Sequence, residues 1–298
     1  MPAIAKPVYG AGTIKRMRRS RARVDQLDQQ ILEVLREDHP QSVRHVFYRM
    51  TDPRLPEPVE KSDRGYRHVQ NRCVEMRRSG LLPYGWISDA SRRGYFVDTY
   101  RGAGDFLQRM KGMYRADIWE FADAHVEVWA ESRSIAGVIQ KDCNELAVDL
   151  YPCGGFSSIT FAHEAASHIN SAVSKPVVIY YIGDFDPAGV LIDQSLEREL
   201  RQHLDGHIDM QFIRLGITES QIAEYDLPTK PRKESDRRAL HVRETVEAEA
   251  MPARTLRALL RANVESWLPT QALKAARVAE ASEREHIERV ARTLRGGM

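Results

Sequence analysis

The chain has 298 residues, of which 42% are hydrophobic and 29% are charged, a balance typical of a soluble globular protein with one large or two ordinary domains. No run of about 18 apolar residues and no apolar N-terminal segment occurs, so we expect neither a membrane span nor a secretory signal. The three cysteines lack metal-ligand spacing, which favours buried thiols in a reducing cytoplasm. The net charge of only +2 does not by itself predict nucleic-acid binding.

Basic residues are concentrated at the N-terminus, where residues 1–21 show little apolar periodicity and are expected to form a disordered tail. Seven cations precede the first acidic residue, Asp25. Such a tail could neutralise DNA phosphates and release counterions, or it could be solvated without a partner, and the composition leaves both open. The cations are Lys6, Lys15, Arg16, Arg18, Arg19, Arg21 and Arg23.

Residues 22–115 are expected to form a winged helix-turn-helix domain. Apolar residues recur at three- and four-residue steps from Arg21, which predicts a first helix. Ser42 is a candidate cap for a second helix, and Asp63 is a candidate cap for a third helix that ends near Gly80. A stretch rich in Gly, Pro and aromatic residues follows at 81–95 and would form the wing. The third helix and the wing would then contact DNA, although such a region can also serve only as a small packing subdomain. The candidate DNA contacts, which could equally be surface charge, are Arg77, Arg78, Arg92 and Arg93.

Residues 116–268 change to an alternation of strand and helix. Strands are expected at 125–130, 176–182 and 208–215, and helices at 134–148, 158–170 and 187–203. This alternation predicts a parallel sheet with right-handed crossovers, so the fold class is α/β with a small α+β N-terminal domain. Functional groups of such sheets lie at the carboxyl ends of the strands. A charged helical segment at 269–298 would be either a solvated helix or a dimer contact.

Three acids stand where two of these strands end. Glu131 follows the first strand, and Asp184 and Asp186 follow the buried run at 176–182. Because residues two apart in extended chain point the same way, the two aspartates could bind one ion. Oxygen ligands of this kind suit Mg²⁺ or Mn²⁺. The alternative is that the Asp-x-Asp pair merely caps the following helix.

This pattern resembles the Toprim domain of topoisomerases, primases and several nucleases. The shared features are the strand-end Glu131, a Gly-containing loop at 153–157, and Asp-x-Asp after a second apolar strand. The segment Gly-Asp-Phe-Asp-Pro-Ala-Gly at 183–189 is especially similar to the topoisomerase VI A subunit and the related meiotic double-strand-break protein. The resemblance implies a Rossmann-like Toprim sheet that holds a divalent cation.

The same family carries a nucleophilic tyrosine in an Arg-x-x-aromatic-Tyr motif upstream of its Toprim domain. This chain has Arg44-His45-Val46-Phe47-Tyr48 there. Residues 245–252 also resemble the family's Val-Glu-Leu-x-Ala-Leu-Pro stretch, but depart from it at Ala248. Without the motif, a tyrosine in an apolar helix would be assigned to the core, and a structural role of such a helix in Toprim proteins stays open as the alternative.

The resemblance implies a type IIB-like topoisomerase that cleaves duplex DNA by transesterification. Tyr48 would attack a phosphate, Arg44 on the same helical face would stabilise the developing charge, and the cation at Glu131, Asp184 and Asp186 would hold the scissile phosphate. Glu131 could instead protonate the 3′ leaving oxygen. The resemblance also implies a homodimer in which the tyrosine of one protomer meets the metal of the other.

The chain has no Gly-x-x-x-x-Gly-Lys-Ser/Thr loop, so ATP hydrolysis would require a separate B-type subunit. A cytoplasmic, nucleoid-associated location would suit this activity. Two other functions stay open: a Toprim nuclease that uses metal-activated water, and a non-catalytic winged-helix DNA-binding protein. A second basic stretch at 230–238 would either line DNA or be solvated.

Overall fold

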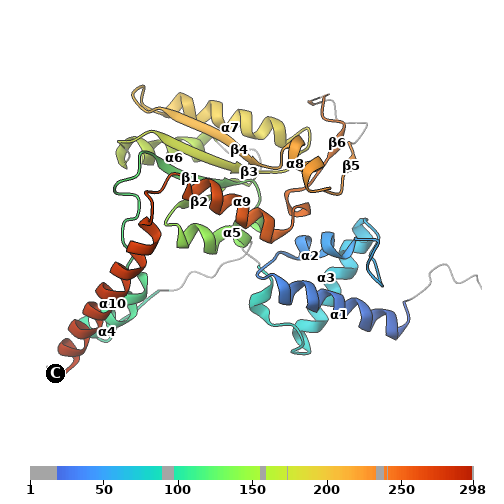
Figure 1. Ribbon diagram of the computed structural model, residues 1–298, viewed down its shortest axis with the longest axis horizontal. Coiled ribbons are helices and arrows are strands. Elements are labelled where there is room, and N and C mark those ends of the chain that lie inside the picture. The colour runs from blue at the N-terminus through green and yellow to red at the C-terminus, as the bar shows by residue number, and fades with distance from the viewer. Residues whose placement is uncertain are drawn as a thin grey trace, which may run out of the picture.

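The computed structural model describes residues 19–88, 97–154, 159–172, 174–232, 238–239 and 241–296. It is an α/β protein with a helical N-terminal region, a four-stranded parallel sheet and a small antiparallel hairpin (Figure 1). Within the described residues, none of the helices combines the length and the apolar character needed to cross a bilayer.

Three helices form the N-terminal region: α1 (Arg21–Glu37), α2 (Val43–Met50) and α3 (Asp63–Arg78). Ser20, Ser42 and Ser62 cap them, each accepting a backbone N–H with its hydroxyl, and such a cap typically contributes about 1 kcal/mol. The prediction of Ser42 as a cap is therefore confirmed. The prediction of Asp63 is wrong by one residue, because the shorter Ser62 side chain precedes it in extended conformation and takes the capping position.

The wing of the predicted winged helix is not found in the described part of the chain. After α3, the left-handed Gly80 (φ 78°) turns the chain into the short 3₁₀ helix η1 (Tyr84–Trp86), and Ile87 forms an isolated bridge with Gln41. Residues 89–96, which would have completed the wing, lie outside the described residues, as do residues 1–18 of the expected tail.

The sheet has the order β2-β1-β3-β4, with all neighbours parallel. Its strands are β1 (His125–Ala130), β2 (Asp149–Pro152), β3 (Val177–Ile182) and β4 (Met210–Gly216). Three of them agree with the expected strands. The fourth strand, β2, is not predicted from the sequence, because its four residues include an exposed Asp149 and Pro152 and show no apolar alternation.

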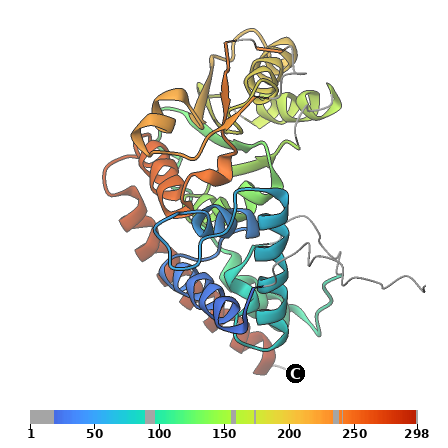
Figure 2. The ribbon, with the colours of Figure 1, turned by 90° about the vertical axis from the view of Figure 1, so that its right-hand side faces the viewer.

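Helices cover both faces of the sheet (Figure 1). One face carries α6 (Ile159–Ala172) and α7 (Gly189–His203), and the other carries α5 (Arg133–Glu145) and α9 (Ala253–Glu265). The apolar cluster on the α5 and α9 face continues without a break into the cores of α1, α2 and α3. The N-terminal helices are therefore packed onto the α/β part and not joined to it only by a linker, as Figure 2 shows from the side.

The remaining elements are short or peripheral. The helix α8 (Glu219–Glu224) precedes a hairpin of β5 (Lys230–Pro231) and β6 (Glu244–Thr245), which leads to the 3₁₀ helix η3 (Ala248–Ala250). The expected C-terminal helix is confirmed as α10 (Ala272–Gly296), which extends away from the sheet with α4 (Ala103–Met110) alongside it; the 3₁₀ helix η2 (Lys111–Met113) follows α4 (Figure 1).

Candidate metal centre and tyrosine site

Glu131 and the aspartate pair meet at the carboxyl ends of neighbouring strands. In the parallel register of β1 and β3, Ala130 lies opposite Ile182. Glu131 and Gly183 are therefore the residues that directly follow the two strands, side by side. The backbone N–H of Asp184 donates to Glu131 Oε2 over 3.0 Å, and the Tyr181 hydroxyl donates to the same oxygen over 3.3 Å. The sheet therefore brings Glu131 and Asp184 together.

Gly183 allows this close approach. A Cβ at this position would lie 2.5 Å from Glu131 Oε2 and 2.7 Å from the Tyr181 ring. Separations below about 3 Å are not tolerated between such atoms, so any side chain here would displace the carboxylate. The glycine in the Gly-Asp-x-Asp motif thus has a steric role.

Asp186 is turned toward the start of α7. Its Oδ1 accepts the N–H groups of Ala188, over 2.9 Å, and Gly189, over 2.6 Å. This is the capping role that was the alternative interpretation of the Asp-x-Asp pair, and a carboxylate at a helix N-terminus is also stabilised by the helix dipole. One oxygen of Asp186 is therefore committed to the backbone.

A second carboxylate pair joins this end of the sheet from the segment around η3. Phe185 and Val246 exchange both backbone hydrogen bonds over 2.8 Å, and the N–H of Ala248 donates to Asp184 Oδ1 over 2.8 Å. These backbone bonds place Glu247 and Glu249 near Asp184. Glu249 is buried and hydrogen-bonds Ser134, while Ser132 donates to it over 3.4 Å. Neither glutamate is among the site residues predicted from the sequence, although both lie in the stretch at 245–252 that resembles the topoisomerase VI A family.

The acids raise one another's proton affinity. Burial raises the pKa of Asp184 to about 7, and the nearby charges of Glu249 and Glu131 act in the same direction. Burial also raises the pKa values of Glu131 and Glu249 above their ordinary values. Such crowding of carboxylates would be relieved by a divalent cation, so the donor set fits Mg²⁺ or Mn²⁺ in chemistry.

The side chains of Glu131, Asp184 and Asp186 are not gathered as a finished coordination shell. Within the described residues, one group of three or more candidate ligand side chains brings its donor atoms within 4.8 Å of one another, and that group is His125, Glu127 and Asp149. A cation at the predicted trio would therefore require rotation of their side chains.

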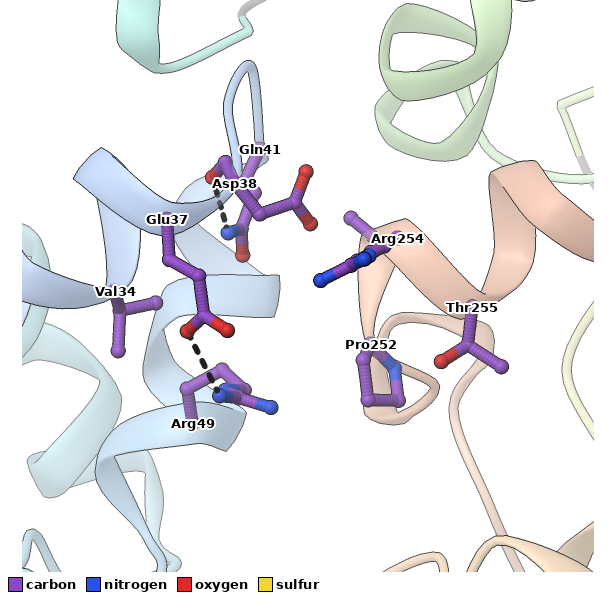
Figure 3. A pocket seen from close by; sticks show the side chains of 9 residues that line it. Val34, Glu37, Asp38, Gln41, Arg49, Pro252, Arg254 and Thr255 are labelled. Carbon is purple, nitrogen blue, oxygen red and sulfur yellow. Dashed lines mark hydrogen bonds and ion pairs between the residues drawn. The ribbon is translucent and has the colours of Figure 1, made fainter.

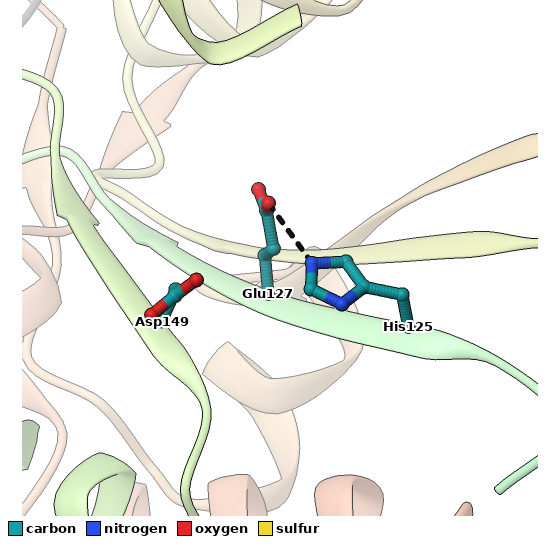
Figure 4. Close-up of side chains that lie close together, drawn as sticks. All are labelled: His125, Glu127 and Asp149. Atoms are coloured by element: carbon teal, nitrogen blue, oxygen red, sulfur yellow. Dashed lines mark hydrogen bonds and ion pairs between the residues drawn. The ribbon is translucent and has the colours of Figure 1, made fainter. Parts of the chain in front are cut away.

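The group of His125, Glu127 and Asp149 lies at the amino ends of β1 and β2, opposite the predicted site (Figure 4). Glu127 is completely buried; it accepts from Trp129 Nε1 over 2.8 Å and is 3.2 Å from His125 Nε2. These bonds satisfy the buried carboxylate without an ion. We therefore interpret the group as a buried polar contact that orients Trp129, and we assign no metal to it.

Tyr48 and Arg44 reach the acids within the same chain. Arg44 forms an ion pair with Glu247 Oε2, and the Tyr48 side chain hydrogen-bonds Glu247. Burial would raise the pKa of Glu247, but Arg44 and Lys230 outweigh it and hold that pKa below its ordinary value. Tyr48 is only 7% exposed, and burial together with Glu247 raises the pKa of its phenol. The tyrosine is thus joined to a carboxylate and mostly covered.

The four predicted DNA-contacting arginines have different surroundings. Arg77 donates to the carbonyls of Tyr84, over 2.6 Å, and Ile87, over 2.9 Å, so it stabilises the chain after α3. Arg78 is exposed, 3.8 Å from Glu75. Arg92 and Arg93 lie outside the described residues. From the basic tail, Arg19 and Arg23 form ion pairs with Glu57.

A small cavity of about 150 Å³ lies between the N-terminal helices and the start of α9 (Figure 3). Arg49 and Arg254 point toward it from the two sides, and Arg49 is 3.8 Å from Glu37. The mixture of charges gives this cavity no evident selectivity for an anion.

No family model, no curated protein and no solved structure matches this chain.

Proposed function

We propose that the chain is a DNA-cleaving transesterase in which Tyr48 attacks a backbone phosphate. One observation carries the proposal: the Tyr48 phenol hydrogen-bonds Glu247, whose neighbour Ala248 is bonded to Asp184 in the same chain. A candidate nucleophile, a carboxylate and the acid cluster therefore adjoin one another. The resemblance to the topoisomerase VI A subunit supports the same chemistry.

In this proposal Glu247 accepts the phenol proton as the Tyr48 oxygen forms a bond to phosphorus. The bond between phosphorus and the 3′ oxygen breaks, and that oxygen takes a proton from Glu131 or from water. Arg44 stabilises the negative charge that develops on the phosphate. A divalent cation held by Glu131, Asp184 and Asp186 would supply further neutralisation of that charge.

The test is to trap a covalent protein–DNA adduct with denaturant after incubation of the chain with duplex DNA and Mg²⁺. We expect an adduct with the parent, none with Tyr48→Phe or Asp184→Ala, and an unchanged yield with Tyr84→Phe, which alters an exposed tyrosine. Cleavage by Tyr48→Phe at the parent's rate, without an adduct, contradicts the proposal.

A second candidate is a nuclease in which metal-activated water attacks the phosphate. The burial and raised pKa of Tyr48 favour it, because a covered and protonated phenol is a poor nucleophile. Under this alternative the Asp184→Ala variant loses cleavage, whereas Tyr48→Phe keeps it. If neither DNA cleavage nor metal affinity depends on Asp184, both proposals fail and a DNA-binding protein without catalysis is the remaining candidate.

The partners stay proposals as well. We propose a homodimer and a separate ATPase subunit on the resemblance alone. Light scattering of the purified chain tests the first, since a monomer at all concentrations contradicts it.

A further inference from the structure

Three cations from three separate segments lie around Tyr48, two of them beside its ring and the third on the carboxylate that it contacts. Lys61, in the loop before α3, has its Nζ 5.8 Å from the ring centroid, and Lys230 of β5 has its Nζ 5.9 Å from the same centroid. Arg44 lies one helical turn before Tyr48 on α2 and contacts the same carboxylate as Tyr48. Residues distant in sequence thus form one positively charged rim around the tyrosine.

The rim has more positive charge than its own carboxylate neutralises. Glu247 pairs with Arg44 and, over 3.3 Å, with Lys230. Lys61 Nζ donates to the carbonyl of Thr229 over 2.8 Å and pairs with no carboxylate in the described part of the chain. Glu247 therefore pairs with two of the three cations, and the third, Lys61, contacts a carbonyl oxygen but no carboxylate. Holding like charges this close is unfavourable unless an anion joins them.

The rim is also open to solvent. The side chain of Arg44 is 41% exposed and that of Lys230 is 44% exposed, whereas the Tyr48 ring beneath them is covered. An anion can therefore reach the cations without any rearrangement of the core. Its charged oxygens would come to lie next to the tyrosine hydroxyl.

We propose that Arg44, Lys61 and Lys230 form a binding site for a phosphodiester of the DNA backbone, with Glu247 as the internal anion that balances the site in the free chain. The inference deepens the proposed function, on which it rests for the choice of DNA as the source of the phosphate. It assigns the phosphate next to the candidate nucleophile to Lys61 and Lys230, and it does so without any metal ion.

The test measures binding of a short fluorescent DNA duplex by anisotropy, in EDTA and over a series of NaCl concentrations. Lys61→Met and Lys230→Met keep the length of the side chain and remove the charge. Each phosphate that is no longer neutralised lowers the slope of log affinity against log salt by about 0.9. Because the site takes one phosphate, we expect the double variant to lose about 0.9 in slope and roughly tenfold in affinity. The matched control is Lys141→Met, on the exposed surface of α5, which should bind as the parent does.

The variant Glu247→Gln gives a change in the opposite direction. It removes the competing carboxylate, so we expect tighter DNA binding at low salt, a gain that misfolding cannot produce. The inference is overturned if the double lysine variant binds within twofold of the parent at every salt concentration, or if Glu247→Gln weakens binding.

Inorganic phosphate distinguishes the source of the anion. If phosphate raises the melting temperature of the parent but not of the double variant, while both bind DNA equally, the site takes a free phosphate and the DNA assignment is wrong. Because these measurements need no cleavage, a chain that binds as expected but forms no adduct contradicts the transesterase proposal and leaves the phosphate site standing.

Discussion

The backbone N–H of Ala248 donates to Asp184 Oδ1 over 2.8 Å, and this bond attaches the turn that carries Glu247 to the end of β3. Glu247 in turn contacts Arg44 and Tyr48 on α2. Beside the apolar core that they share, the N-terminal helices and the sheet are thus also connected by polar contacts around this turn. A substitution on one side of that turn is therefore expected to alter the contacts on the other side.

Stability in the absence of metal should depend on Asp184 and on pH. Its pKa is raised from 3.8 to about 7, so the folded chain binds more protons than the unfolded chain between these values. Stability should therefore be greatest at the acidic end of this range and should fall as the pH rises through 7. Melting temperatures in EDTA across this range measure the effect.

In that experiment Asp184→Asn should flatten the pH profile, because the amide does not ionise, and Mg²⁺ should raise the melting temperature of the parent most above pH 7. An Asp184→Asn profile as steep as that of the parent would contradict the assignment to this residue.

Gly183→Ala should distort the acid cluster. The new Cβ would lie 2.5 Å from Glu131 Oε2, and overpacking of this kind costs about 1–3 kcal/mol. Urea unfolding should show that loss, and Mg²⁺ should stabilise the variant less than it stabilises the parent. Gly206→Ala is the control, because a Cβ at position 206 meets no atom within 4 Å. Equal stability of the two variants would show that Glu131 is not held as described.

Glu247→Gln should lower the pKa of the Tyr48 phenol. Burial is the largest cause of the raised pKa, and the charge and hydrogen bond of Glu247 raise it further. Removing the charge of Glu247 lowers this pKa but leaves the effect of burial in place. The difference in phenolate absorbance between each chain and its Tyr48→Phe counterpart isolates this tyrosine. Glu244→Gln, an exposed change on β6, should leave the titration in place. If the pKa of the Tyr48 phenol is the same in Glu247→Gln as in the parent, then Glu247 does not contribute to it and the contact between the two residues is contradicted.

Glu127→Leu should destabilise the fold by about 1–3 kcal/mol, because it leaves the buried Trp129 Nε1 without its acceptor. Glu127→Gln keeps an acceptor oxygen and should cost less. Urea unfolding followed by tryptophan fluorescence measures both. If Glu127→Gln is as damaging as Glu127→Leu, then the charge of this carboxylate matters beyond the hydrogen bond to Trp129, and our interpretation of the His125 group fails.

Local patterns in the sequence were enough to predict most of the elements. The uninterrupted apolar run at 176–182 predicts a strand buried on both faces, and β3 is buried throughout. The position of Glu131 and Asp184 at strand ends followed from the same patterns. The strand β2 was missed because four residues with a Pro and an exposed Asp carry no periodic signal.

Only the tertiary structure decided which distant residues surround Tyr48. Lys61, Lys230 and Glu247 are separated by up to 186 positions, and no local pattern relates them. Their meeting depends on the packing of α2 against η3 and on the backbone ladder between Phe185 and Val246. The sequence by itself determined three of the four strands of the sheet, the helix cap at Ser42 and the acids at the strand ends, because these depend on neighbours along the chain. The charged rim and the burial of the tyrosine depend on packing between segments that are far apart in the sequence, and local sequence patterns do not reveal such contacts.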